Sequence, residues 1–240
     1  MPFTNRYPWR ILTCLAVLTA CTLPAPPAEP ARGIPASVLT PSTQPSSSQP
    51  TSVYRIDSEA STLHILVYRG GTLARLGHNH VISSRSVSGR IWRSTALENS
   101  GFAISIPVNA LIVDDNAARA AEGEDFPLNV AEDAKQGTKA NMLRDTLLDG
   151  AHYPDISLHA VSLQGDADAP RVIATLRIKD QTRNVTVPVT LRLADGNLHA
   201  KGEFEIKQTD FGITPLSVAL GALLVLDAIK IKFDLVAKPD

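Results

Sequence analysis

The sequence predicts an all-β, mainly antiparallel domain in which a sheet of eight or so strands closes on itself. Apolar and polar residues alternate along several segments, which is the period of a half-buried strand. Short turn sequences separate these segments, and strands that are joined by short turns must run antiparallel. A sheet of this size tends to curl, because closure removes its exposed edges.

The alternation is clearest in five segments, at residues 102–108, 171–178, 185–193, 198–206 and 229–235. Turn signals lie at Gly70-Gly71, Gly165-Asp166, 179–182 and 194–197. Side chains of alternate residues point to the same face of a strand. We therefore expect the inward positions, among them Ile104, Leu176, Val187 and Phe204, to line or close the barrel.

One segment departs from this period. Residues 131–148 place apolar side chains at roughly helical spacing, which predicts a helical crossover after about the fifth strand. A shorter helix is expected at 116–121. Within the crossover, Met142 is a candidate cavity residue. Arg144 is a candidate either for an ion pair with Asp145 or for a contact with a lipid headgroup.

Residues 213–226 form an uncharged, apolar stretch. Because a membrane-spanning helix needs about 20 such residues, we interpret this shorter stretch as a strand and a turn that lead into the last strand. Its surplus of apolar side chains would suit a cavity mouth or a rim that faces a membrane.

The N-terminus has the pattern of a secretory signal. Arg6 and Arg10 precede an apolar run, and no acidic residue lies among residues 1–20. The sequence Leu18-Thr19-Ala20-Cys21 resembles the lipobox of bacterial lipoproteins, which implies that Cys21 is acylated and anchors the chain. The alternative is an ordinary secretory signal with a chance cysteine. Thr22 follows where inner-membrane lipoproteins typically carry Asp, so the resemblance favours the outer membrane.

After the signal at residues 1–20, we expect three consecutive features: the lipidated Cys21, a linker to residue 52, and one domain over residues 53–240. The linker is rich in Pro, Ser and Thr and has few charges, so it cannot bury enough apolar surface to fold. The domain is of ordinary size for a single core.

Charge and composition exclude several functions. The chain has 23 basic and 24 acidic side chains with no basic block, so nucleic acid is not an expected partner. With Cys21 acylated, the domain has no cysteine for a disulfide or for thiolate catalysis. The sequence lacks a G-x-S-x-G elbow, a phosphate-binding loop and an H-E-x-x-H pattern, and we do not expect an enzyme or a bound cofactor.

A concatenation of short matches resembles the YceI-like family of polyisoprenoid-binding periplasmic proteins. The matching segments are VYRID and STL at 53–57 and 61–63, NMLRD running to YPDI at 141–156, the stretch 174–189, and IKQTDFGI at 206–213. They cover nearly the whole of 53–238 in the right order.

The resemblance implies an extended, lipocalin-like, eight-stranded barrel with a short helical insertion, whose interior holds an isoprenoid-type or other long apolar chain. The expected protein is thus a lipid-anchored binding protein of the cell envelope, on its periplasmic side, that sequesters or carries such a ligand. Its partners would be the apolar lipid and, through the acyl anchor, the membrane.

A departure from the family pattern supplies the alternative. Residues 75–82 read RLGHNHVI, where His78 and His80 are two positions apart and would share one face of an extended strand. Two imidazoles on one face can chelate a metal ion if further ligands complete the shell. The competing interpretation is that they hydrogen-bond across strands or line a polar end of the barrel. A metal- or redox-linked accessory protein of the envelope is therefore the second functional hypothesis.

Overall fold

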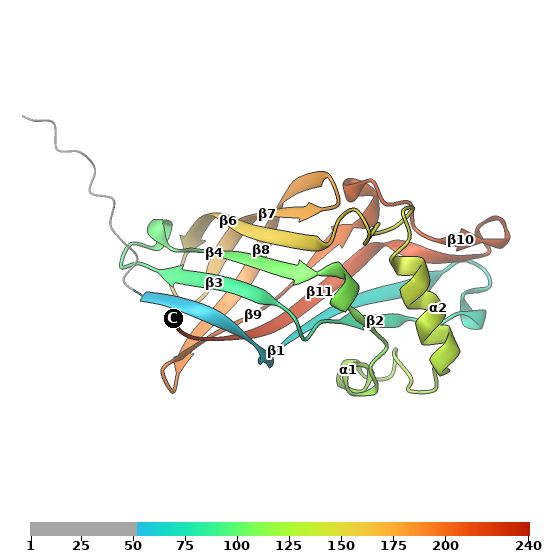
Figure 1. Cartoon of the computed structure of the whole chain (residues 1–240), viewed down its shortest axis with the longest axis horizontal. Coiled ribbons are helices and arrows are strands. Elements are labelled where there is room, and N and C mark those ends of the chain that lie inside the picture. Colours follow the sequence, from blue (N-terminus) through green and yellow to red (C-terminus); the bar gives the residue numbers. More distant parts are fainter. Residues whose placement is uncertain (1–51) are drawn as a thin grey trace, which may run out of the picture. The chain divides into compact units, whose positions relative to one another are not determined.

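The structure is a computed structural model that describes residues 52–240. All of its strands belong to one antiparallel sheet, and eight of them form a closed ring in which β11 pairs with β1 (Figure 1). In ring order, these strands are β1 (Ser52–Gly70), β3 (Ser88–Arg93), β4 (Gly101–Pro107), β6 (Asp155–Gly165), β7 (Pro170–Ile178), β8 (Gln181–Ala194), β9 (Asn197–Lys207) and β11 (Leu223–Pro239). The prediction of an eight-stranded antiparallel barrel is confirmed.

Three short strands extend the ring. The first half of β1 pairs with β3, and after a bulge between Asp57 and Thr62 its second half pairs with β2 (His80–Ser83). β2 continues to β5 (Ile112–Val113), and β10 (Ser217–Val218) pairs with the start of β11. The bulge lets one long strand serve two partners, because it bends and twists the strand locally.

Two helices lie between β5 and β6. Helix α1 (Asn116–Glu122) is capped at its start by Asp115, whose carboxylate accepts hydrogen bonds from two backbone N–H groups. Gly123, with φ 81°, follows its last residue and ends it. Helix α2 (Glu132–Met142) is shorter than the predicted crossover. Residues 143–148 turn away because three leucines in them pack against the barrel core, which outweighs continuation of a largely polar helix.

The apolar stretch 213–226 folds as β10, a short turn at Ala219–Gly221 and the beginning of β11, as predicted. No helix within residues 52–240 has the length and apolarity needed to cross a membrane. The predicted signal, Cys21 and all of the linker except Ser52 lie outside the described residues.

The alternation of inward and outward side chains agrees closely with the prediction. Val172, Ala174, Leu176 and Ile178 of β7 are all buried. Leu193, the last residue of the alternation in β8, is an exception at 55% exposure. It pairs with Leu198 beside the β8–β9 hairpin turn, and Leu198, unlike Leu193, is fully buried.

Candidate functional site

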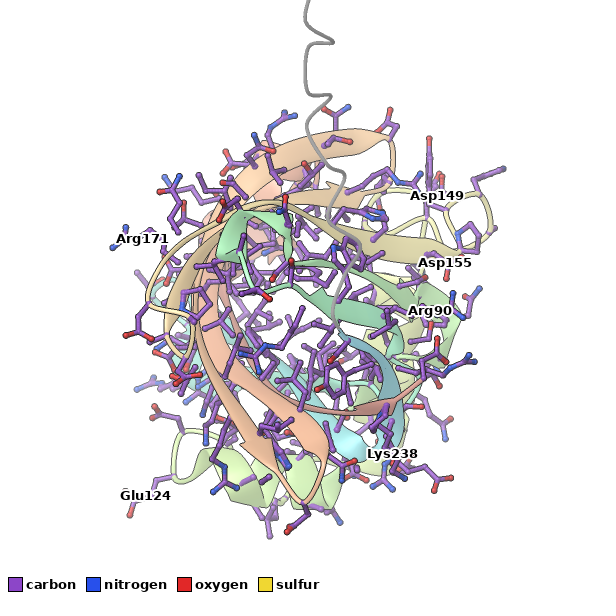
Figure 2. The ribbon with its side chains drawn as sticks, turned by 90° about the vertical axis from the view of Figure 1, so that its left-hand side faces the viewer. Arg90, Glu124, Asp149, Asp155, Arg171 and Lys238 are labelled. Atoms are coloured by element: carbon purple, nitrogen blue, oxygen red, sulfur yellow. The ribbon has the colours of Figure 1, made fainter. Side chains whose placement is uncertain are left out.

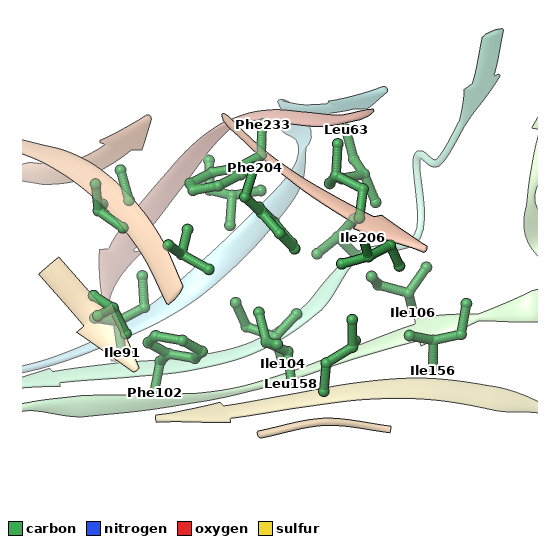
Figure 3. A pocket seen from close by; sticks show the side chains of 18 of the residues that line it. Leu63, Ile91, Phe102, Ile104, Ile106, Ile156, Leu158, Phe204, Ile206 and Phe233 are labelled. Atoms are coloured by element: carbon green, nitrogen blue, oxygen red, sulfur yellow. The ribbon is translucent and has the colours of Figure 1, made fainter. Parts of the chain in front are cut away.

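The interior of the barrel is an apolar cavity rather than a filled core. Its volume is about 250 Å³, far above the ~10–15 Å³ that a single buried water requires. Every strand of the ring contributes side chains to the wall, most of them Leu, Ile, Val or Phe (Figure 3). Such a wall offers contacts to a hydrocarbon and almost no hydrogen bonds.

The two-residue period builds this wall. On β1, Leu63, Ile65 and Val67 line the cavity, whereas His64 and Leu66 point to the outer face. β11 follows the same rule across the seam of the barrel, where Leu63 pairs with Phe233 and Ile65 with Ile231. Closure of the ring therefore places aromatic and branched side chains opposite one another.

The two ends of the cavity differ. At one end, Leu111, Phe211 and Ile213 are at most 5% exposed and close the barrel. At the other end, the lining includes Thr95 and Ala167, which are exposed, so the cavity reaches solvent there. We call this end the mouth. Figure 2 looks onto it along the barrel and shows charged side chains on its outside.

The polar residues of the lining gather mainly at the mouth. Arg93 is the last residue of β3, and Ser94, Thr95 and Ser100 belong to the connection between β3 and β4. The hydroxyl of Ser100 accepts a hydrogen bond from the backbone N–H of Ser94 at 2.9 Å. An amphiphile whose tail lies inside the barrel would find its polar partners here.

Five of the predicted cavity residues lie in the wall: Ile104, Leu176, Val187, Phe204 and Met142. Whether they contact a ligand stays a prediction. Arg144, by contrast, is exposed and is not part of the lining, and its contact with a lipid headgroup stays a prediction. The chain turns directly after α2 and directs its leucines, not Arg144, toward the core. The carboxylate of Asp145, its expected partner, instead accepts a hydrogen bond from the N–H of Thr146.

His78 and His80 do not share a strand face. Only His80 belongs to β2, while His78 is exposed in the preceding loop, with 6.4 Å between the ring centroids. The Nδ1 of His80 lies 2.6 Å from a carboxylate oxygen of Asp114. In the described part of the chain, no three His, Cys, Asp or Glu side chains are grouped so that they could hold a metal ion.

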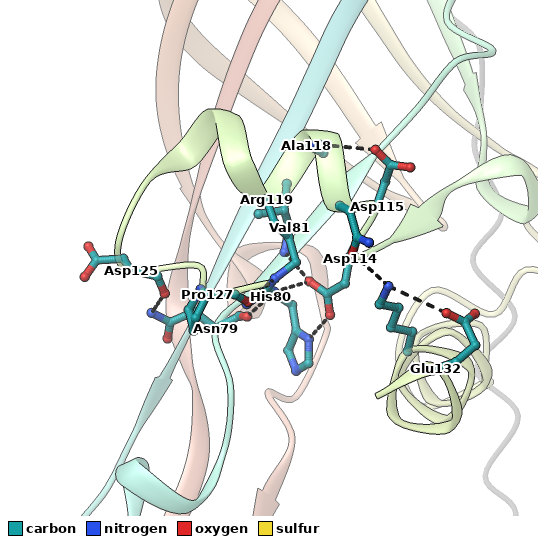
Figure 4. Close-up of polar contacts among 12 residues, drawn as sticks. Asn79, His80, Val81, Asp114, Asp115, Ala118, Arg119, Asp125, Pro127 and Glu132 are labelled. Carbon is teal, nitrogen blue, oxygen red and sulfur yellow. Dashed lines mark hydrogen bonds and ion pairs between the residues drawn. The ribbon is translucent and has the colours of Figure 1, made fainter. Parts of the chain in front are cut away.

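Sequence reasoning missed the polar network that His80 joins (Figure 4). Asp114 and Arg119 form an ion pair with both side chains fully buried. Arg119 also donates to the backbone carbonyls of Asn79 and Pro127, each at 2.8 Å. The network thus fastens α1 to the loops on both sides of it. The only sequence signal is a lone arginine within the alanine-rich residues 116–122.

Burial and hydrogen bonding act in opposite directions on Asp114. Removal from water raises the pKa of a carboxyl group, but His80, the N–H of Val81 and Arg119 stabilise the carboxylate and hold the pKa of Asp114 below its usual value. Asp114 has a φ of 55°, a conformation that Asp and Asn tolerate better than most residues. It is therefore charged and tightly positioned at neutral pH.

A second network joins α1 to the outer face of β1 and β11. Glu122 at the end of α1 accepts from His64 on β1 at 2.7 Å and from Lys232 on β11 at 2.6 Å. Burial raises the pKa of Glu122, and the hydrogen bonds from Lys232 and His64 outweigh it, so that the net shift is downward. Both networks hold α1 against the outside of the barrel, away from the cavity.

Solved structures include two relatives with this fold. BcnA of Burkholderia cenocepacia has 17% identity and a TM-score of 0.56, covering 76% of this chain and 99% of its own. A polyisoprenoid-binding domain from Saccharophagus degradans, implicated in plant cell wall breakdown, has 16% identity and a TM-score of 0.51, covering 78% and 98%. No curated protein matches the chain.

Family membership is shown more directly by the sequence. The family model for the YceI-like domain matches residues 54–237, which include nearly all of β1 and β11, the strands that meet at the seam of the barrel. The expected family is therefore confirmed, and the chain belongs to the YceI-like family.

Proposed function

We propose that this protein is a lipid-anchored periplasmic binding protein that sequesters or carries an isoprenoid-type or other long apolar ligand in its barrel. The observation that carries the proposal is the cavity, which runs from Phe211 and Ile213 at the closed end to Thr95 and Ala167 at the mouth. An unfilled interior reduces the stability of a protein. A binding function accounts for that cost.

The chemistry of the wall selects an apolar chain. Transfer of such a chain out of water is favourable by about 0.8 kcal/mol for each buried methylene. A five-carbon unit thus gains on the order of 4 kcal/mol, which a carrier would retain while it moves the chain through an aqueous compartment. The polyisoprenoid-binding domain that shares this fold supports the same ligand class.

The proposed location rests on the N-terminal sequence. A signal-like segment ends at Cys21, and acylation there would tether the barrel to a membrane, with the outer membrane favoured by Thr22. Replacement of Cys21 by Ser should release the protein from membranes or leave the signal uncleaved. A mature chain that starts elsewhere and carries no acyl mass would disprove the anchor.

Native mass spectrometry with lipid extraction tests the ligand. The ring, its core and its cavity lie within residues 52–240, so a chain that starts at Ser46 contains the whole domain. We expect this domain to copurify with a long-chain apolar molecule, or to take up a fluorescent prenyl probe after delipidation. Failure to bind any prenyl or acyl chain would refute the carrier function.

A pair of variants locates the binding in the cavity. Val189 points into the cavity and its neighbour Thr190 points out of the same strand. Val189→Trp should fill part of the cavity and weaken probe binding by about tenfold or more, which corresponds to a loss of about 1.4 kcal/mol or more in the free energy of binding. Thr190→Trp adds the same side chain outside and should leave binding unchanged. Equal effects would place the ligand elsewhere.

The metal- or redox-linked hypothesis has its own test. Titration of zinc, copper or nickel into the purified protein and into His78→Ala would show saturable binding and its loss if that hypothesis holds. Because the structure already engages His80 with Asp114, we expect flat titrations in both proteins.

A further inference from the structure

Two loops meet at the closed end of the barrel, opposite the mouth. Residues 70–77 comprise the end of β1 and most of the loop that leads to β2. Residues 213–226 hold β10, the turn after it and the start of β11, and the two segments lie side by side in Figure 1. The N–H of Leu73 donates to the carbonyl of Ala222 at 2.7 Å, and Gly70 pairs with Leu224. We call these two segments together the apolar tip.

The tip concentrates the exposed apolar surface of the domain. Six of the nine exposed large apolar side chains in residues 52–240 belong to it: Leu73, Leu76, Leu216, Val218, Leu220 and Leu226. Leu220 is fully exposed at 109% and Leu76 is 67% exposed. Single exposed apolar residues are normal, but a contiguous group of this kind marks an interaction site.

The backbone of the tip holds Leu220 in this position. Ala219 and Leu220 have φ values of 50° and 54°, and Gly221 follows with 87°. The left-handed region is sterically disfavoured for a residue as bulky as leucine. The turn is nevertheless closed by hydrogen bonds, with Ala222 donating to Ala219 and Val225 to Leu216. A strained turn thus presents a leucine to solvent.

The charge of the tip indicates what it meets. Its two segments contain no acidic residue and a single basic one, Arg75, which is exposed and precedes Leu76. Leucine and valine side chains partition into the acyl boundary of a bilayer, while a guanidinium binds the phosphates above it. This arrangement is complementary to a lipid surface.

The shape of the tip disfavours a protein partner. A stable protein interface needs closely complementary, well-packed surfaces, whereas Leu220 projects without any neighbour that covers it. A fluid apolar medium accepts such a projecting side chain without a matching pocket.

We propose that the apolar tip docks the barrel onto a lipid bilayer by shallow insertion of the Leu220 turn and of Leu76, with Arg75 at the phosphates. This contact is separate from the proposed acyl anchor and from the cavity. It brings the closed end to the membrane and leaves the mouth, where Arg93 lies, facing away from that surface.

Vesicle co-sedimentation tests the docking, with the chain that starts at Ser46 so that no N-terminal anchor takes part. The vesicles contain phosphatidylcholine with a minor share of phosphatidylglycerol. The triple variant Leu216→Ser, Val218→Ser and Leu220→Ser should lower the partition coefficient by about tenfold or more, because it removes apolar area from the contact. Arg75→Gln should remove the preference for phosphatidylglycerol.

A control of the same size removes three exposed apolar side chains elsewhere on the domain. Leu128, Val161 and Leu193 are 54%, 57% and 55% exposed and lie outside the tip. Their triple replacement by Ser should leave the partition coefficient unchanged. Equal losses in both triple variants would overturn the proposal, because binding would then follow total apolar surface rather than the tip.

A depth measurement gives an independent readout. In Leu220→Trp, vesicles with brominated acyl chains should quench the new fluorescence, whereas Leu193→Trp should be unaffected. Absence of quenching at residue 220, or no vesicle binding by the unmodified domain, would refute the docking. So would a dimer in solution that the tip triple variant converts to a monomer, since the tip would then be a contact between two copies.

Probe uptake separates this proposal from the carrier function. The tip triple variant should bind the prenyl probe as the unmodified domain does, because none of its three residues lines the cavity. If the unmodified domain takes up the probe but does not bind vesicles, only the docking proposal is refuted. If it binds vesicles but does not take up the probe, only the carrier function is refuted.

Discussion

The two faces of β1 show how differently one strand can be used. Its inward residues Leu63, Ile65 and Val67 line an unfilled apolar cavity. Its outward residue His64 contacts the buried side chain of Glu122, the last residue of α1. The inner face forgoes packing contacts, and the outer face takes charged groups out of water. Both arrangements sacrifice stability, but only the inner one creates room for a ligand.

The difference suggests a division of work. The outer face has a buried cluster of its own, in which Val81, Ala118 and Phe126 pack beside the Asp114–Arg119 pair. This cluster does not border the cavity. Changes on the outer face should therefore alter stability more than ligand binding, and changes on the inner face should do the reverse.

The largest expected effect is the loss of the buried charge pair. Asp114→Asn keeps the shape of the side chain and tolerates the positive φ, but leaves Arg119 charged and fully buried. We expect a loss of about 3–5 kcal/mol in the free energy of unfolding, measured by denaturant titration.

Asp240 supplies the matched control for this change. It pairs with Arg55 and Arg90 at the surface, at 2.6 and 2.8 Å, and such pairs contribute about 0–1 kcal/mol. Asp240→Asn should thus cost far less than Asp114→Asn. Similar losses would contradict the view that burial makes the Asp114–Arg119 pair essential.

Two phenylalanines compare the faces directly. Phe126 is 2% exposed on the outer face, with its ring 5.5 Å from that of Tyr68, and Phe126→Ala should cost about 3–5 kcal/mol. Phe204 borders the cavity on one side, so Phe204→Ala should cost only about 2 kcal/mol, close to its transfer free energy. Denaturant titration measures both losses. Only Phe204→Ala should change probe binding.

A helix cap gives a smaller effect. Asp115 caps α1 by accepting hydrogen bonds from Ala117 and Ala118, both at 3.1 Å. Asp115→Ala should lower the free energy of unfolding by about 1 kcal/mol, with no change in probe affinity. An altered affinity would show that α1 is coupled to the cavity.

A change of pH near neutrality should have the smallest effect on the free energy of unfolding. The folded pKa values of Asp114 and Glu122 lie below their usual ones, so near those values the unfolded chain binds more protons than the folded one. Their contribution is complete above the ordinary carboxyl range and is lost as the pH falls toward the folded values. Unfolding free energy should be level above about pH 5 and decline below it.

Glu122→Gln tests the source of the acid decline. It removes one of the carboxyl groups whose pKa is lowered in the folded protein, so the curve should fall less steeply below the ordinary carboxyl pKa. An unchanged acid limb would assign the pH dependence to other carboxylates.

Local pattern was enough for much of the barrel and of its wall. The alternation in residues 171–178 and 198–206 identifies strands and inward positions, because the two-residue period depends only on backbone geometry. The same pattern placed Ile104, Leu176, Val187 and Phe204 in the wall. It does not apply to Arg144 on the crossover, whose direction depends on how residues 143–148 pack against the core.

The site on the outer face was not predictable in the same way. Nothing near His80 in the sequence points to Asp114, and the two meet only because β2 pairs with β5. The expectation that His78 and His80 share a face assumed an extended chain at both residues, whereas β2 begins at His80.

The sequence by itself determined the strand period, the turns and the apolar character of the interior, since these are properties of neighbouring residues. Only the tertiary structure decided that the ring closes at β1 and β11 around an unfilled space, and that Asp114 meets Arg119 and His80. Closure, cavity volume and buried ion pairs depend on distances between residues far apart in the chain, and a local periodicity contains no information about those distances.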